Sequence, residues 1–83
     1  MTKNDFIFGS RENVDGFARA KRWQSNGRAS WVTPDGDCVL FLAFEEQLAA
    51  VREGERIYIV GKLTLKCERA LKKVGAIIVH ARM

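Results

Sequence analysis

The stretch FEEQLAAVREGERIYIVGKLTLK, residues 44–66, changes its hydrophobic period half-way along and decides the expected fold. Leu48 and Val51 mark the buried side of a short helix, and Gly54 supplies the left-handed residue on which such a helix ends. From Arg56 onward apolar residues recur at every second position, which is typical of an amphipathic strand. The stretch therefore predicts a short helix followed by a long strand.

The two faces of this expected strand differ. One face is apolar and would pack on a core. The other combines an aromatic ring with polar and basic side chains, namely those of Tyr58, Lys62, Thr64 and Lys66. An outer face of this kind indicates a surface that can receive a ligand.

The composition is that of a small, moderately basic globular chain. Its 83 residues suffice for one domain with a single modest core, and the formal net charge of +4 is compatible with an anionic partner. No apolar run approaches the roughly 20 residues that span a bilayer. Residues 1–16 also lack the continuous apolar segment of a secretory signal. We therefore expect one domain in the cytoplasm, without membrane contact.

The cysteines and the histidine do not suggest metal or redox chemistry. Cys38 and Cys67 lack CxxC spacing, and His80 is the sole histidine. We expect two reduced thiols, with Cys38 half-buried in a strand and Cys67 in a loop. Because no nucleophile motif, glycine-rich phosphate loop or paired carboxylates stand out, we expect no enzyme, no cofactor and no metal.

Before residue 44 the sequence predicts strands joined by turns. Ser25-Asn26-Gly27 predicts a tight hairpin between strands at residues 17–23 and 28–33, because Asn-Gly tolerates positive backbone angles. Residues 34–37, Pro-Asp-Gly-Asp, predict a second turn. The nearly all-apolar Cys38–Phe44 segment predicts a central strand covered on both sides.

The two ends of the chain leave alternatives open. Residues 67–75 read as the charged tip of a hairpin that leads into a last strand at residues 74–83, and a helical turn at residues 68–73 is the alternative. Residues 1–15 contain the apolar trio Phe6-Ile7-Phe8, and the alternatives are an N-terminal arm, an extra edge strand or a first strand of the domain at residues 6–9.

The resulting order is strand, strand, strand, helix, strand, strand. It indicates an all-β domain with one short helix, the five-stranded Greek-key barrel of the oligonucleotide-binding (OB) fold, over residues 1–83, with the helix between the third and fourth strands. Closing the sheet would hide its edges. An open sheet with one packed helix and a small SH3-like barrel are the alternatives.

The segment VLFLAFEEQLAAVREGERIYIVGKLTLK, residues 39–66, resembles bacterial single-stranded DNA-binding proteins. There an apolar strand ends in phenylalanine, and a short helix, a glycine and a strand of the type VYV-x-G-K/R-L follow. The matching residues here are Phe44, Leu48, Ala49, Gly54, Ile57, Tyr58, Ile59, Gly61, Lys62 and Leu63. The ending IIVHARM is similar to the last strand of those proteins and of primosomal replication protein N.

This resemblance covers residues 38–82 and is weak over the first 37 residues. It implies an OB fold, binding of single-stranded DNA in DNA replication, and assembly into dimers or tetramers. The acidic tail through which that family recruits other replication proteins is not found up to Met83, so that role is not expected here.

Basic and aromatic side chains concentrate at the same predicted hairpins, which predicts a nucleic-acid site. The cations would bind phosphates, and exposed rings would stack bases at ~1–3 kcal/mol each. The predicted site comprises Lys21, Arg22, Trp23, Arg28, Trp31, Tyr58, Lys62, Lys66, Arg69, Lys72 and Lys73. The alternative for the two tryptophans is a place in the core or a cross-strand pair, and Phe17, Phe41 and Phe44 are expected in the core.

The preferred function is therefore non-enzymatic binding of single-stranded nucleic acid, with DNA favoured and RNA open. Contact with about three to five phosphates would give a log–log salt slope of about −2 to −4. A protein-interaction module or inhibitor on the same barrel, without a nucleic-acid role, is the alternative. Binding of duplex RNA or tRNA is a third candidate. A homodimer or homotetramer is expected, because a short barrel leaves apolar surface that a second copy can cover.

Overall fold

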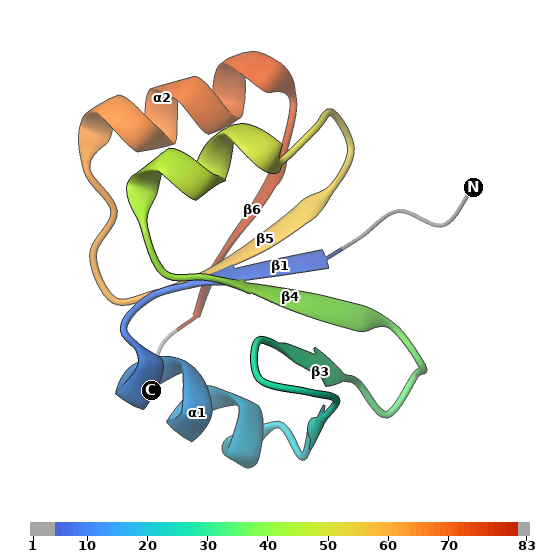
Figure 1. Cartoon of the computed structure of the whole chain (residues 1–83). Coiled ribbons are helices and arrows are strands. Elements are labelled where there is room, and N and C mark those ends of the chain that lie inside the picture. Colours follow the sequence, from blue (N-terminus) through green and yellow to red (C-terminus); the bar gives the residue numbers. More distant parts are fainter. Residues whose placement is uncertain (1–4, 82–83) are drawn as a thin grey trace.

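A computed structural model of the chain describes residues 5–81 (Figure 1). Along the chain the elements are β1 (Asp5–Phe8), α1 (Arg11–Ala20), β2 (Gln24–Ser25), β3 (Ser30–Val32), β4 (Cys38–Leu42), the 3-10 helix η1 (Glu45–Ala50), β5 (Arg56–Val60), α2 (Leu65–Val74) and β6 (Ile77–Ala81).

The strands form one open, mixed sheet with the order β2-β3-β4-β1-β5-β6. β1 pairs in parallel with both β4 and β5, and β5 pairs in parallel with β6. β2, β3 and β4 are antiparallel neighbours. The expected five-stranded all-β barrel is therefore wrong. The fold is an α/β mixture, because parallel neighbours require crossover connections and these carry the helices.

Helices cover both faces of the sheet. α1 lies on one face, and η1 and α2 lie together on the other (Figure 1). Side chains alternate along β1, so Phe6 and Phe8 pack in the cluster under η1 and α2, whereas Ile7 packs in the cluster under α1. The Phe6-Ile7-Phe8 trio thus forms the middle of a two-faced core. It belongs to the first strand, as one alternative expected, and lies neither in an arm nor at an edge of the sheet.

Local signals explain both ten-residue helices. In α1, the buried residues Val14, Phe17 and Ala18 follow the spacing of one helical face. In α2, the side chain of Thr64 accepts a hydrogen bond from the amide of Cys67, and Gly75 ends the helix in the left-handed conformation at φ 82°. The strand expected at residues 17–23 and the hairpin tip expected at residues 67–75 are therefore wrong, and the alternative of a helical turn at residues 68–73 is the correct one.

Other expectations are confirmed. The short helix after residue 44 is η1, and a strand does begin at Arg56, although it ends at Val60 and not near Lys66. An antiparallel hairpin does surround the Asn-Gly turn, with Ser25 paired to Trp31.

The expected positions of the two cysteines are wrong. Cys38 lies in a strand, β4, but is exposed and not half-buried, and Cys67 lies in α2 and not in a loop.

Asp5 begins the central strand next to Arg56, with 3.9 Å between carboxylate oxygen and guanidinium nitrogen. Desolvation by burial raises the pKa of Asp5 above its ordinary value of 3.8, and Arg56 offsets this only in part. A carboxyl whose pKa is raised by folding binds its proton more tightly in the folded chain. Its contribution to stability is therefore present at low pH and is lost as the pH rises through the raised pKa.

We predict that Asp5→Asn removes the loss of stability that deprotonation of Asp5 causes as the pH rises. The free energy of unfolding of the variant minus that of the natural chain should increase as the pH rises from about 3 to about 6. Urea denaturation at each pH measures the difference. A difference that stays constant or decreases over this window would contradict the assignment.

Candidate functional site

The structure separates the residues of the predicted nucleic-acid site. Lys21 and Arg22 follow the last turn of α1, and Arg28 lies in the turn between β2 and β3. The basic residues of α2 lie across the sheet from α1, on the other face; they are Lys66, Arg69, Lys72 and Lys73. Lys62 lies in the loop after β5. The basic residues near α1 and those of α2 therefore lie on opposite faces of the sheet and cannot form one continuous binding surface.

The three predicted base-stacking rings pack against the protein instead. Trp31 is only 5% exposed, and its ring centroid lies 6.0 Å from that of Phe41. Trp23 and Tyr58 are half-buried, and both rings contact Phe17, with centroid distances of 5.3 Å and 5.9 Å. The aromatic residues therefore connect α1 to the sheet.

Phe44, in contrast, is exposed where the sequence predicted burial. We expected its ring in the core, but 66% of the residue is exposed. Phe44 lies between the end of β4 and η1, so a flat ring is presented at the edge of the sheet where β4 ends.

The carboxyl ends of β1, β4 and β5 meet at that same edge, because the three strands are parallel. The loops after β1 and β5 are in contact there. A Cβ atom on Gly9 would lie 2.5 Å from the carbonyl oxygen of Val60, so only glycine fits without displacement. Gly61 has a φ of +104°, and its Cβ position lies 3.9 Å from Nδ2 of Asn13 in α1.

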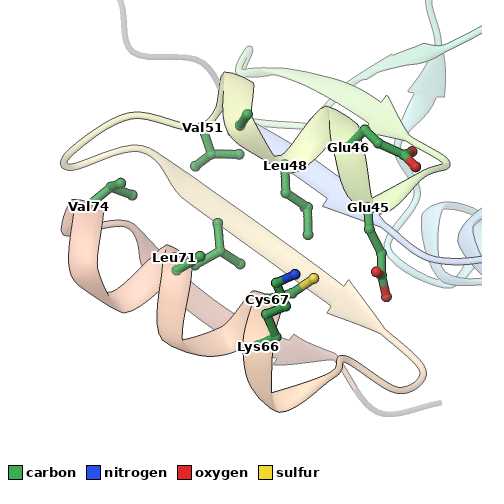
Figure 2. A pocket seen from close by; sticks show the side chains of 10 residues that line it. Glu45, Glu46, Leu48, Val51, Lys66, Cys67, Leu71 and Val74 are labelled. Carbon is green, nitrogen blue, oxygen red and sulfur yellow. The ribbon is translucent and has the colours of Figure 1, made fainter.

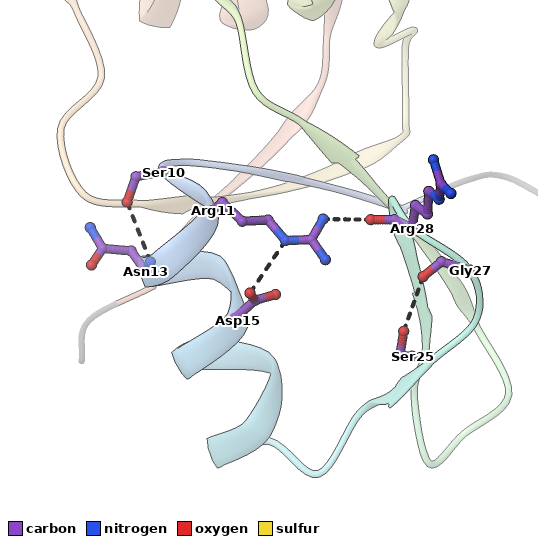
Figure 3. Close-up of polar contacts among 7 residues, drawn as sticks. All are labelled: Ser10, Arg11, Asn13, Asp15, Ser25, Gly27 and Arg28. Carbon is purple, nitrogen blue, oxygen red and sulfur yellow. Dashed lines mark hydrogen bonds and ion pairs between the residues drawn. The ribbon is translucent and has the colours of Figure 1, made fainter.

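Both ten-residue helices begin at this carboxyl edge. Ser10 caps α1, since its hydroxyl oxygen accepts a hydrogen bond of 3.3 Å from the backbone amide of Asn13 (Figure 3). Thr64 caps α2 in the same way, since its hydroxyl oxygen accepts a hydrogen bond of 3.3 Å from the backbone amide of Cys67. The first amides of a helix lack intrahelical partners, and the helix dipole makes that end positive. The edge therefore combines two electropositive helix ends with two glycine loops.

Arg11 lies in the first turn of α1 but is already occupied. Its Nε lies 3.3 Å from the carboxylate of Asp15, and an Nη donates to the carbonyl of Arg28 (Figure 3). Its guanidinium also lies 5.6 Å from the ring centroid of Trp31 and 5.4 Å from that of Phe41. Arg11 thus fastens α1 to the β2–β3 hairpin.

Two basic residues of the predicted set lie at the edge, namely Lys62 in the loop after β5 and Lys66 in the first turn of α2. Both are exposed, and neither takes part in the three ion pairs formed within residues 5–81. The acids of the edge are Glu12 in the first turn of α1 and Glu45 and Glu46 in the first turn of η1. An anion at this edge would be attracted by Lys62, Lys66 and the helix starts, and repelled by these carboxylates.

The topology marks the same place. From β1 the chain crosses by α1 toward β4 on one face, whereas from β5 it crosses by α2 to β6 on the opposite face. Connections that leave in opposite directions open a crevice at the carboxyl ends of adjacent strands, which is where open α/β sheets bind ligands. Here the adjacent strands are β1 and β5.

Metal chemistry finds no support in the part of the chain that the structure describes. Within residues 5–81 no three His, Cys, Asp or Glu side chains gather in a way that could hold an ion. His80 is exposed on β6. No helix in the same range is long and apolar enough to cross a membrane.

The Gly9-Ser10 turn is the part of this edge that the sequence reasoning missed. An apolar strand, then Gly-Ser, then the spacing of Val14, Phe17 and Ala18 is a strand–turn–helix signal. It was hidden because residues 17–23 also alternate as a strand would.

The chain matches no family of known proteins, no curated protein and no solved structure. The candidate site therefore stands on its own geometry.

We predict that Gly9→Ala lowers the free energy of unfolding by about 2 kcal/mol or more, because its methyl group would overlap the Val60 carbonyl. Gly36→Ala is the matched control: it has a φ of +89° but no atom within 4 Å of its Cβ position, and should cost about 1 kcal/mol. Urea denaturation measures both. An equal or smaller cost at Gly9 would contradict the contact.

A second prediction tests whether the two tryptophans stabilise the fold by packing. Trp31→Ala should lower the free energy of unfolding by about 3 kcal/mol, because the indole is buried between α1 and the sheet. Trp23→Ala should cost roughly half as much, because Trp23 is half-buried. Thermal and urea unfolding test this, and an unchanged stability in Trp31→Ala would show that the ring is not part of the core.

Proposed function

We propose that this chain is a non-enzymatic binder of nucleotides and holds a phosphate at the carboxyl edge of β1 and β5. The observation that carries the proposal is the close approach of Gly9 to the carbonyl of Val60, which joins the ends of β1 and β5 at the edge where α1 and α2 begin on opposite faces of the sheet. Backbone amides at helix starts and close glycine backbone are how α/β proteins hold phosphate.

The remaining groups at the edge fit the parts of a nucleotide. Lys62 supplies a cation to the phosphate, and the exposed ring of Phe44 supplies a surface on which a base can stack. Ser10 and Thr64 use their hydroxyls as helix caps, which supports a binding role for the edge over a nucleophilic one.

The nucleotide can be free or part of single-stranded DNA or RNA, since the phosphate chemistry is shared. The separation of the basic groups onto two faces favours few phosphate contacts. We therefore propose one or two engaged phosphates, with a log–log salt slope of about −0.7 to −1.4 for a single strand. We place the chain in the cytoplasm, in keeping with its unpaired cysteines.

The test is isothermal titration at low salt with three probes: inorganic pyrophosphate, a nucleoside triphosphate and an oligothymidylate. Lys62→Ala should weaken binding about three- to tenfold, because one charged contact is lost. Glu12→Gln should strengthen it about two- to threefold, because a like charge is removed. Lys72→Ala in α2, whose side chain is paired with Glu68 at 3.2 Å, is the control and should change little.

The three probes also distinguish the sources of the phosphate. A triphosphate that binds at least as tightly as the oligonucleotide indicates a free nucleotide, and the reverse order indicates a nucleic-acid strand. Absence of binding by all three probes, or equal effects of Lys62→Ala and Lys72→Ala, would reject the proposed edge.

A further inference from the structure

A groove of about 600 Å³ runs between η1 and α2 (Figure 2). Leu48 and Leu71 line it from the two helices and are themselves buried. Val74, at the far end of α2, also lines it and is 46% exposed. The groove is therefore an apolar depression on the outer side of the helical layer, away from α1.

The two walls of the groove carry opposite charges. Glu45 and Glu46 project from η1, and Lys66 from α2 (Figure 2). Lys73 lies two helical turns after Lys66 and so on the same side of α2. All four residues are exposed, and none takes part in the three ion pairs formed within residues 5–81. One wall is acidic, the other is basic, and neither is neutralised.

Small residues lie along both walls. Ala49 of η1 and Ala70 of α2 line the groove and are exposed. Short side chains at these positions allow another helical layer to approach closely.

We propose that the groove is the interface of a homodimer, in which a second copy of this chain packs its own η1 and α2 face to face on the first. A two-fold axis parallel to the groove places η1 of each copy opposite α2 of the other. Both helices start at the carboxyl edge of the sheet, so Glu45 and Glu46 meet Lys66 of the second copy at the same height. A two-fold axis perpendicular to the groove would instead place η1 opposite η1 and α2 opposite α2, so that like charges would face each other.

This arrangement has two consequences. The apolar floors of the two grooves face each other and exclude water, with the opposite charges around them as a polar rim. Both carboxyl edges also point the same way, although the dimer does not depend on what those edges bind. A contact of this modest extent predicts a weak dimer, with a Kd in the micromolar range.

Charge reversal tests the arrangement by sedimentation equilibrium from roughly 10 to 500 µM. The natural chain should pass from monomer to dimer over this range. An acid-reversed variant (E45K and E46K) and a base-reversed variant (K66E and K73E) should each dimerise at least about tenfold more weakly, because like charges then face one another. An equimolar mixture of the two variants should recover the dimer, because each reversed wall meets its complement.

A second pair of variants guards against a loss of folding in the reversed chains. Ala70→Glu places a charge in the groove with a residue that helices tolerate well, and should be a folded monomer by circular dichroism and sedimentation. Ala20→Glu, exposed at the end of α1 on the other face, should dimerise as the natural chain does.

The proposal is overturned by a natural chain that stays monomeric throughout this range or by an Ala70→Glu variant that still dimerises. Folded reversed variants whose mixture does not associate also overturn it, and an apolar peptide or another protein would then be the occupant to seek.

Discussion

Burial of β1 on both faces is the constraint on which the rest of the structure depends. Phe6, Ile7 and Phe8 are each less than one tenth exposed, so this short strand must have helices above and below it and a strand on either side. Both neighbouring strands run parallel to it, which requires crossovers. α1 lies in the connection from β1 to β4 and η1 in the connection from β4 to β5, and α2 completes the cover on the side of η1 in the crossover from β5 to β6.

The same constraint creates the candidate site. A strand in the middle of a parallel set ends beside its neighbours, and Gly9 allows its loop to approach the end of β5 closely. The starts of α1 and α2 lie at this edge with Lys62 and the exposed ring of Phe44. The aromatic residues that are not at this edge, such as Trp31, hold α1 on the sheet together with Arg11. The two faces thus have separate roles: α1 stabilises the fold, and the layer of η1 and α2 carries a groove with charged walls.

Part of this could be predicted from the sequence. Strong local signals identified η1, the start of β5 and the hairpin at Asn26-Gly27, because each depends on neighbouring residues alone. The parallel pairing of β1 could not be found in this way, because it joins residue 6 to residues 40 and 57 and no local pattern encodes such pairs. An all-apolar trio is nevertheless typical of a strand buried on both faces, but the interpretations considered were an arm, an edge strand or a first strand, and none of them placed the trio at the centre of the sheet.

Helix α1 was missed because two periods overlap. Residues 17–23 alternate as a strand would, while Val14, Phe17 and Ala18 have helical spacing, and the helix prevails because it buries these three side chains on the sheet. The site prediction was affected by the second missed helix, α2. Of the basic residues proposed for nucleic-acid contact, Lys62 and Lys66 lie at the carboxyl edge, whereas those further along α2 belong to a segment that was interpreted as a hairpin tip.

The central claim, that the carboxyl edge of β1 and β5 receives phosphate, is tested most directly by an amide NMR titration with a nucleoside triphosphate. We expect the shifted amides to lie in residues 9–13 and 61–67, on the two loops and the two helix starts. Shifts confined to the end of α1 or to the last turn of α2, or no shifts at about millimolar ligand, would contradict it.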